Sequence, residues 1–261
     1  MELKFHKYQG TGNDFIILDN RKNEYSALSP KNVKKLCTRN FGIGADGLML
    51  LNEKEGFDFD MTYYNADGNE GSLCGNGSRC MIKFARSIGI IKDHFLFTAS
   101  DGEHEAKLAE NGIVSLKMKD VDAIQRHHLD FILNTGSPHL IKMTSDVMKL
   151  DVIKKGKEIR YSSEFEKEGI NVNFVEQLTE PDKIIVRTYE RGVENETLSC
   201  GTGVTAAAIV CFHNESGFNE IEIKTPGGML NVEFDRTDQG NFKNIWLCGP
   251  AEKVFEGSMT I

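Results

Sequence analysis

Long apolar runs, a basic excess and clustered cysteines are all missing from this chain of 261 residues. No stretch approaches the ~18 uninterrupted apolar residues of a membrane-spanning helix, and the first residues lack the apolar core of a secretory signal. The formal net charge is -8, which argues against nucleic acid as a main partner, because phosphate binding requires a basic face. We therefore expect a cytoplasmic protein that binds neither nucleic acid nor membrane.

Cysteine is scarce, with six residues and no C-x-x-C spacing. Six are too few for a disulfide scaffold in a chain of this length, and their spacings do not match a structural zinc site. We expect no metal. Four of the cysteines are predicted to be small buried hydrophobic residues, namely Cys37, Cys80, Cys211 and Cys248.

What the chain does contain is a duplicated segment. Cys74-Gly75-Asn76-Gly77 recurs 126 residues later as Cys200-Gly201-Thr202-Gly203. We call these two segments the Cys-Gly-X-Gly units. Residues 98–102 recur at 225–228, and residues 12–15 recur loosely at 136–139. Three repeats in the same order at nearly the same offset indicate an ancient duplication.

Short strand-like runs separated by Gly, Asn and Asp predict a mostly antiparallel sheet. Residues 76–88 and 202–213 form the two strongest helical patterns. The second is apolar almost all round, which predicts a helix buried in a core. The first keeps Arg79, Lys83 and Arg86 and is expected to be less enclosed. Shorter helices are predicted at 31–38 and 146–154.

The predicted fold class is therefore α+β, with two pseudo-symmetric domains. Each is a mostly antiparallel sheet wrapped around a central helix, and the active site lies in the cleft between them. Residues 1–121 form the domain that carries Cys74, and residues 122–249 form the domain that carries Cys200. The tail, 250–261, is expected to return to the first domain. The polar segment 120–128 is predicted to be the linker.

Each Cys-Gly-X-Gly unit opens a predicted helix, and this position favours an anion site. A helix N-terminus offers backbone N–H groups and the positive end of the macrodipole, and glycine lets a ligand approach closely. A cysteine at this position is expected to have a lowered pKa. Two such thiols on opposite sides of one carbon could act as base and acid.

Other interpretations of these motifs remain. Residues 42–47 match G-x-G-x-x-G but lead into a strand, and residues 201–206 match its variant without a surrounding βαβ unit. A single Cys–His nucleophile pair with His139 or His6 is conceivable, although it does not explain the duplication. Two thiols in one cleft could also form a redox pair.

Seven segments together resemble the diaminopimelate epimerase family. The paired cysteine segments alone are shared with proline racemase and its relatives, whereas the Asn-Ala-Asp-Gly and Tyr-Glu-Arg-Gly segments point to diaminopimelate epimerase. The segments span most of the chain, and they are residues 10–15, 42–47, 64–68, 73–80, 171–174, 189–192 and 199–203.

The resemblance implies an isomerase without cofactor that interconverts LL-2,6-diaminopimelate and meso-diaminopimelate, a step towards lysine and peptidoglycan. Cys74 and Cys200 would be the two bases, with His139 and Glu190 completing the catalytic set by supporting the thiols. Arg191 would grip the distal carboxylate of the substrate. The implied substrate-binding residues are Asn13, Asn65, Gly75, Asn76, Asn171, Glu190, Arg191, Gly201 and Thr202.

Three features depart from the family pattern. Ser137 stands where many members have Asn, Gly47 replaces a Gln, and the loop from Glu190 to Cys200 is one residue longer. The alternatives that stay open are another cofactor-independent racemase of the proline racemase type and a non-enzymatic redox dithiol protein. A homodimer is one of the assemblies that the sequence leaves open.

Overall fold

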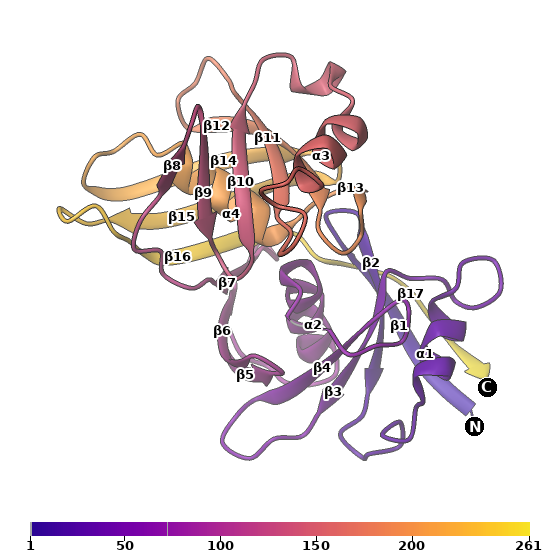
Figure 1. Ribbon diagram of the computed structural model, residues 1–261. Helices are drawn as coiled ribbons and strands as arrows, with labels where there is room; N and C mark the ends of the chain where they lie inside the picture. Colours follow the sequence, from indigo (N-terminus) through magenta and orange to yellow (C-terminus); the bar gives the residue numbers. More distant parts are fainter. Residues whose placement is uncertain (1, 72) are drawn as a thin grey trace. The chain divides into compact units, whose positions relative to one another are not determined.

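The computed structural model describes residues 2–71 and 73–261, and the chain divides into two compact units. The first unit runs to Leu116 and also includes Gly249–Ile261, and the second is Lys117–Cys248 (Figure 1). Among the described residues, no helix is long and apolar enough to cross a membrane.

The first unit is a sheet wrapped around helix α2 (Gly75–Ser87), with the short helix α1 (Pro30–Cys37) on its outside (Figure 1). Strands β1, β2, β3, β6 and β17 all pack against α2. The strands are β1 (Glu2–Gly10), β2 (Asn13–Asp19), β3 (Gly47–Asn52), β4 (Phe59–Asn65), β5 (His94–Ala99), β6 (Gly102–Leu108), β17 (Glu252–Thr260) and, at the unit boundary, β7 (Val114–Lys117).

The second unit repeats this arrangement around α4 (Gly201–Val210), whose residues are all buried except Thr202 and Val210. This confirms the core position predicted from its apolar surface. The unit also contains a 3-10 helix (Val147–Lys149) and α3 (Val152–Arg160). Its strands are β8 (Gln125–His127), β9 (Asp130–Asn134), β10 (Pro138–Met143), β11 (Asn171–Gln177), β12 (Lys183–Glu190), β13 (Asn195–Thr197), β14 (Gly217–Thr225), β15 (Gly228–Arg236) and β16 (Phe242–Gly249).

Strand pairing repeats from one unit to the other. Strands β2 and β3 pair in parallel with Phe15 opposite Gly47, and β10 and β11 pair in parallel with His139 opposite Asn171. The parallel pair β4–β5 corresponds in the same way to β12–β14. The hairpins that follow are antiparallel in both units, so the predicted α+β fold of two related, mostly antiparallel halves is confirmed.

Two predicted elements are wrong in part. The helix predicted at 146–154 is a 3-10 turn followed by α3, because Leu150 has an extended backbone (φ -72°, ψ 137°) and Asp151 caps a new helix by accepting the N–H of Lys154. The linker predicted at 120–128 contains β8, which pairs with β9 through a turn at His128 (φ 54°). The side chains of β8 are polar and mostly exposed, so no apolar alternation marks it in the sequence, and backbone pairing with β9 makes it a strand.

Neither β1 nor β17 is predicted as a strand from the sequence, although buried Leu3 and Phe5 alternate with exposed residues in β1. They pair with each other antiparallel from Glu2 opposite Thr260 to Gln9 opposite Glu252. Strand β17 is almost wholly exposed, so backbone pairing with β1, rather than side-chain burial, makes it a strand.

Candidate active site

Cys74 and Cys200 occupy the same local position, the N-cap of a helix. Cys74 has φ -105° and ψ 118° before α2, and Cys200 has φ -115° and ψ 110° before α4. Neither side chain caps its helix, whereas both carbonyls accept a first helical hydrogen bond, from Ser78 at 2.8 Å and from Val204 at 2.9 Å. Each cysteine therefore lies at a helix end whose positive partial charge stabilises anions.

The last glycine of each Cys-Gly-X-Gly unit is required by close packing. A Cβ on Gly77 would lie 3.0 Å from the sulfur of Met49 and 3.5 Å from a ring carbon of Phe15. A Cβ on Gly203 would overlap the side-chain oxygen of Asn173. Glycine thus lets a strand side chain lie directly against the first turn of the helix, in addition to any role in ligand approach.

In the first unit, the structure brings together two of the predicted substrate contacts, Asn13 and Asn76. The Asn76 amide donates to the Asn13 side-chain oxygen at 2.6 Å, and the Asn13 amide donates to the Asp46 carboxylate at 2.9 Å. Asn65 is the exposed last residue of β4, opposite Gly47 on β3.

An ionic cluster holds Asp46 and hence Asn13 in place. Asp14 lies 2.7 Å from the Lys7 ammonium, and Arg39 contacts Asp14 at 2.6 Å and Asp46 at 2.8 Å. Burial by itself would raise the pKa of Asp14, but the hydrogen bonds from Arg39 and Lys7 hold that pKa below its usual value. Asp14 therefore stays ionised, and the cluster fixes the carboxylate that orients Asn13.

Arg79 is fully buried in the first half of α2, which corrects the expectation that it is only partly enclosed. Its guanidinium donates to Thr11 at 2.6 Å, to Asn76 at 3.0 Å and to the carbonyl of Pro250 at 3.4 Å. These acceptors come from segments far apart in the sequence, so helical periodicity alone could not reveal them. The result is a buried cation close to the helix end that follows Cys74.

In the second unit, His139 lies fully buried on β10. Its Nδ1 is 3.1 Å from the side-chain nitrogen of Asn173 on β11, and its Nε2 has no hydrogen-bond partner among the described residues. Burial in the first place, and the charge of Arg191 in the second, lower the pKa of His139 to about 3. The imidazole is therefore neutral at neutral pH.

The predicted contacts Asn171 and Arg191 also lie side by side. The Asn171 amide donates to Ser137 Oγ at 2.9 Å and to the Pro138 carbonyl at 3.0 Å, and its oxygen accepts the backbone N–H of Arg191 at 2.9 Å. The Arg191 guanidinium donates to Ser137 Oγ at 3.3 Å and to the Glu168 carbonyl at 3.1 Å. Ser137 therefore joins the two residues assigned to the substrate.

The remaining predicted residues of this unit flank the loop before α4. Glu190 ends β12 half-buried, opposite Asn195 in the β12–β13 hairpin that leads towards Cys200. Thr202 lies just after that cysteine, with its hydroxyl 3.6 Å from the Cys200 sulfur and its carbonyl accepting a hydrogen bond from Thr135 at 2.8 Å.

Sequence reasoning missed five polar residues that support these groups. Of these, Asn173 had a usable signal, because it lies two residues after Asn171 and so faces the same side of a strand. The others are ordinary Thr and Arg residues whose partners are distant in sequence. The five are Thr11, Arg79, Thr135, Asn173 and Thr188.

The other four cysteines are buried. Burial raises the pKa of Cys37 and of Cys211 to about 12, and it raises the pKa of Cys80 further still. Across residues 2–71 and 73–261, no group of three or more His, Cys, Asp or Glu side chains is arranged to hold a metal ion.

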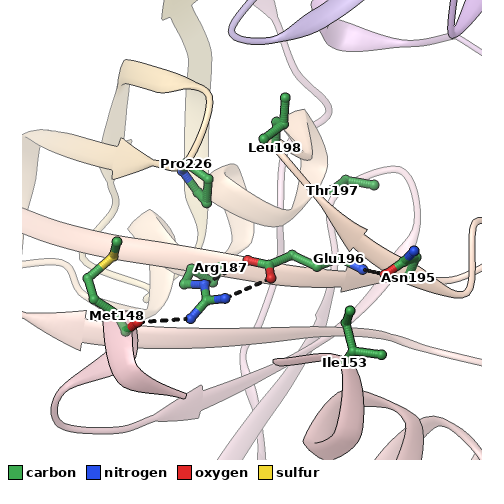
Figure 2. A pocket seen from close by; sticks show the side chains of 8 residues that line it. All are labelled: Met148, Ile153, Arg187, Asn195, Glu196, Thr197, Leu198 and Pro226. Atoms are coloured by element: carbon green, nitrogen blue, oxygen red, sulfur yellow. Dashed lines mark hydrogen bonds and ion pairs between the residues drawn. The ribbon is translucent and has the colours of Figure 1, made fainter. Parts of the chain in front are cut away.

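A separate pocket of about 390 Å³ lies on the second unit. Figure 2 shows its two charged residues joined, with Arg187 donating to both oxygens of Glu196 at 2.6 and 2.7 Å. Arg187 also donates to the Val147 and Leu150 carbonyls at 2.9 Å, so it ties the 3-10 turn to the hairpin that leads to α4. The pocket contains none of the predicted site residues, and its Arg187–Glu196 ion pair ties parts of the fold together.

The fold places the chain in a known structural class. A PhzF-family phenazine biosynthesis protein of Bacillus anthracis has the same fold, with a TM-score of 0.78 and 16% identity over the whole of both chains. A hydroxyproline epimerase from Agrobacterium vitis superposes with a TM-score of 0.69 at 11% identity, covering 99% of this chain and 92% of the other. These likenesses define the fold class alone.

Sequence comparison gives the family. The diaminopimelate epimerase family model matches residues 5–123 and 131–254. The diaminopimelate epimerase of Flavobacterium psychrophilum is 49% identical over 255 residues, covering 97% of this chain and 99% of the relative. That of Chlorobaculum tepidum is 41% identical over 262 residues, with the same coverage. The chain belongs to the diaminopimelate epimerase family.

Proposed function

We propose that this chain interconverts LL-2,6-diaminopimelate and meso-diaminopimelate, with Cys74 and Cys200 as a pair of acid–base groups. Family membership supports the reaction, and one observation carries the assignment of the thiols: the only two Cys-Gly-X-Gly units in the sequence both place their cysteine at a helix N-cap with nearly the same backbone angles. A reaction that removes a proton from one face of a carbon and adds one to the other needs two such groups.

The proposed reaction is a proton transfer in two halves. One cysteine thiolate takes the α-proton, so the C–H bond breaks, an S–H bond forms, and the electron pair is left on the substrate. The opposite thiol then gives its proton to the other face of the carbon and becomes the thiolate. The N–H groups at the starts of α2 and α4 would hold the α-carboxylate and stabilise its growing charge, through Gly75 and Asn76 and through Gly201 and Thr202.

The rest of the proposed site holds the distal end of the substrate. Asn171 and Arg191 form one cluster with Ser137, and Arg191 is suited to the distal carboxylate. Asn13, Asn65 and Glu190 complete the proposed contacts, with His139 and Glu190 also supporting the thiols. We propose that the enzyme uses no cofactor and acts in the cytoplasm. The proposal is compatible with a homodimer.

The decisive assay starts from LL-diaminopimelate in D₂O under reducing conditions with no added cofactor. We expect meso product that carries solvent deuterium early in the reaction, while recovered substrate carries none, because the abstracted proton stays on the other sulfur. Cys74→Ser and Cys200→Ser should each lose about 10²–10⁴-fold in kcat, because a serine hydroxyl is a much weaker acid than a thiol.

Each competing function predicts a different result, which is tested with proline as substrate or with a redox partner. Turnover of proline at a comparable kcat/KM would move the chain to the proline racemase type. Absence of any epimerisation, together with dithiol–disulfide turnover with a redox partner, would make it a redox protein. A serine variant of either cysteine that kept near wild-type epimerisation would contradict the two-thiol mechanism.

A further inference from the structure

A closed hydrogen-bond network surrounds the side chain of Asn173. The amide nitrogen lies 3.1 Å from Nδ1 of His139 and 3.2 Å from the carbonyl oxygen of Leu140, and the amide oxygen lies 2.9 Å from the hydroxyl of Thr188. Asn173 and His139 are fully buried, and Thr188 is nearly so. The amide is therefore shielded from bulk solvent, and it makes its hydrogen bonds with these three neighbours.

The chemistry of these neighbours fixes which way the amide points. A backbone carbonyl only accepts hydrogen bonds, so the atom facing Leu140 must be the NH₂ group, and the hydroxyl of Thr188 then donates to the amide oxygen. The same NH₂ group faces Nδ1 of His139. That ring nitrogen must therefore be the acceptor, with its lone pair free of a proton, and the proton of the neutral imidazole must be on Nε2.

The other end of the imidazole is then a donor. Its Nε2 is buried and has no partner among residues 2–71 and 73–261. Leaving a buried N–H group without a partner is unfavourable, and such groups in native proteins are few. A donor kept in this state is available to an anion that arrives or forms during a reaction.

The first unit has an apolar pair at the positions equivalent to this polar pair. In the first unit, the β2–β3 register places Phe15 opposite Gly47 and Ile17 opposite Met49. In the second unit, the β10–β11 register places His139 opposite Asn171 and Ile141 opposite Asn173. Phe15 and Met49 thus hold the positions of His139 and Asn173. Phe15 and Met49 pack against Gly77, just as Asn173 packs against Gly203. In the first unit, two apolar side chains therefore fill the space that His139 and Asn173 fill in the second.

We propose that Asn173 is a positioning residue that holds His139 in the Nε2–H tautomer, so that the imidazole donates a hydrogen bond to a cysteine thiolate and cannot take the α-proton itself. The inference rests on the proposed function for its catalytic consequence. The tautomer is a property of the resting protein and is tested separately.

The first experiment is NMR of the protein labelled with ¹⁵N-histidine, with the His139 signals assigned by their loss in His139→Gln. We expect an unprotonated Nδ1 and a protonated Nε2 across pH 5–9. A protonated Nδ1 in the wild-type protein would overturn the proposal. Asn173→Asp replaces the donor by a carboxylate, which should move the proton to Nδ1 or create an imidazolium. Asn173→Ala adds no charge and should give mixed tautomers, so it serves if the Asp variant fails to fold.

The second experiment measures turnover of diaminopimelate. Asn173→Asp should lower kcat by roughly 10²-fold, the size expected for losing one donor to a developing anion, with KM changed less than about threefold. In the His139→Gln background the same substitution should add little further loss, because Asn173 acts through His139. Asn219→Asp makes the same substitution at another fully buried amide of this unit, whose hydrogen-bond partners lie at residues 213–217, and it should keep the wild-type tautomer and most of kcat.

Additive losses in the double variant would make Asn173 a structural residue and refute the proposal. Wild-type protein with the stated tautomer but no epimerisation would instead refute the proposed function and leave the His139–Asn173 arrangement standing. The two failures are therefore told apart by the NMR signals and the wild-type assay.

Discussion

Gly203 makes room for Asn173. A Cβ at position 203 would overlap the side-chain oxygen of Asn173, whose amide is fixed by its own hydrogen bonds and cannot move aside cheaply. The related glycine of the first unit, Gly77, faces the sulfur of Met49, which is the flexible end of a long side chain. The two glycines of the duplicated motif therefore differ in how well their positions tolerate a larger side chain.

Substitution by alanine tests this difference. We expect Gly203→Ala to lower the free energy of unfolding by about 1–3 kcal/mol, as overpacking does in other cores, and to reduce kcat because Asn173 is displaced. Gly77→Ala should change stability by about 1 kcal/mol or less, since Met49 can shift and alanine favours a helix. Urea unfolding of the two variants beside wild type gives the comparison. Equal losses for both would contradict the role given to Asn173.

Arg79→Met is expected to destabilise the first unit strongly. The change removes the charged donor that Thr11, Asn76 and the Pro250 carbonyl share, at a cost of about 2–5 kcal/mol in all. The matched control is Arg86→Met on the same helix, whose ion pair with Asp93 is exposed and should contribute no more than about 1 kcal/mol. Thermal melts of both variants decide the point, and a melting temperature of the Arg79 variant no lower than that of the control would refute it.

Substrate choice should depend on the Ser137–Arg191 contact. Arg191→Met should lower kcat/KM for diaminopimelate roughly 10- to 100-fold, because a charged hydrogen-bond donor to the distal carboxylate is lost. Ser137→Asn places the residue that many family members have between Asn171 and Arg191, with a longer side chain that both donates and accepts hydrogen bonds. It should raise kcat/KM roughly 3- to 10-fold. Lysine, which lacks the second carboxylate, should be a poor substrate of the wild type.

Lys149→Met serves as the control for the loss of a cation, because its ion pair with Asp146 is exposed on the same unit. It should leave kcat/KM unchanged. Lysine turned over as well as diaminopimelate by the wild type would remove the distal carboxylate from the recognition scheme.

His139 should weaken the fold in acid. Its pKa is about 3 in the folded protein and near 6.5 when unfolded, so between these values the unfolded chain binds more protons. Stability is then full above pH 6.5 and falls as pH drops towards 3, by up to ~1.4 kcal/mol per pH unit. His139→Gln should flatten this slope between pH 6 and 4. Burial also lowers the pKa of His6, so a smaller slope should remain.

Chemical unfolding at several pH values measures these slopes. An unchanged slope in the His139 variant would mean that His139 is protonated in the folded protein over the same pH range as in the unfolded chain. That result would contradict the lowering of its pKa by burial.

The sequence could predict the features that depend on local pattern. The apolar run of 202–213 and the motif before it were enough to place a core helix with Cys200 at its start, because a helix without a polar face must be buried. The duplicated motif predicted the same for α2. Helix ends and short strands were less accurate, as the 3-10 turn before α3 and the strand β8 show.

By itself, then, the sequence determined the family, the pair of cysteines and the two-fold repeat of helix and sheet, since these depend on residue order and periodicity. The tertiary structure decided what surrounds them. Arg79 and Asn173 became buried because their polar partners come from distant strands, and no periodicity records such pairings. The tautomer of His139 has the same origin, because it is set by a carbonyl and a hydroxyl that only folding brings against Asn173.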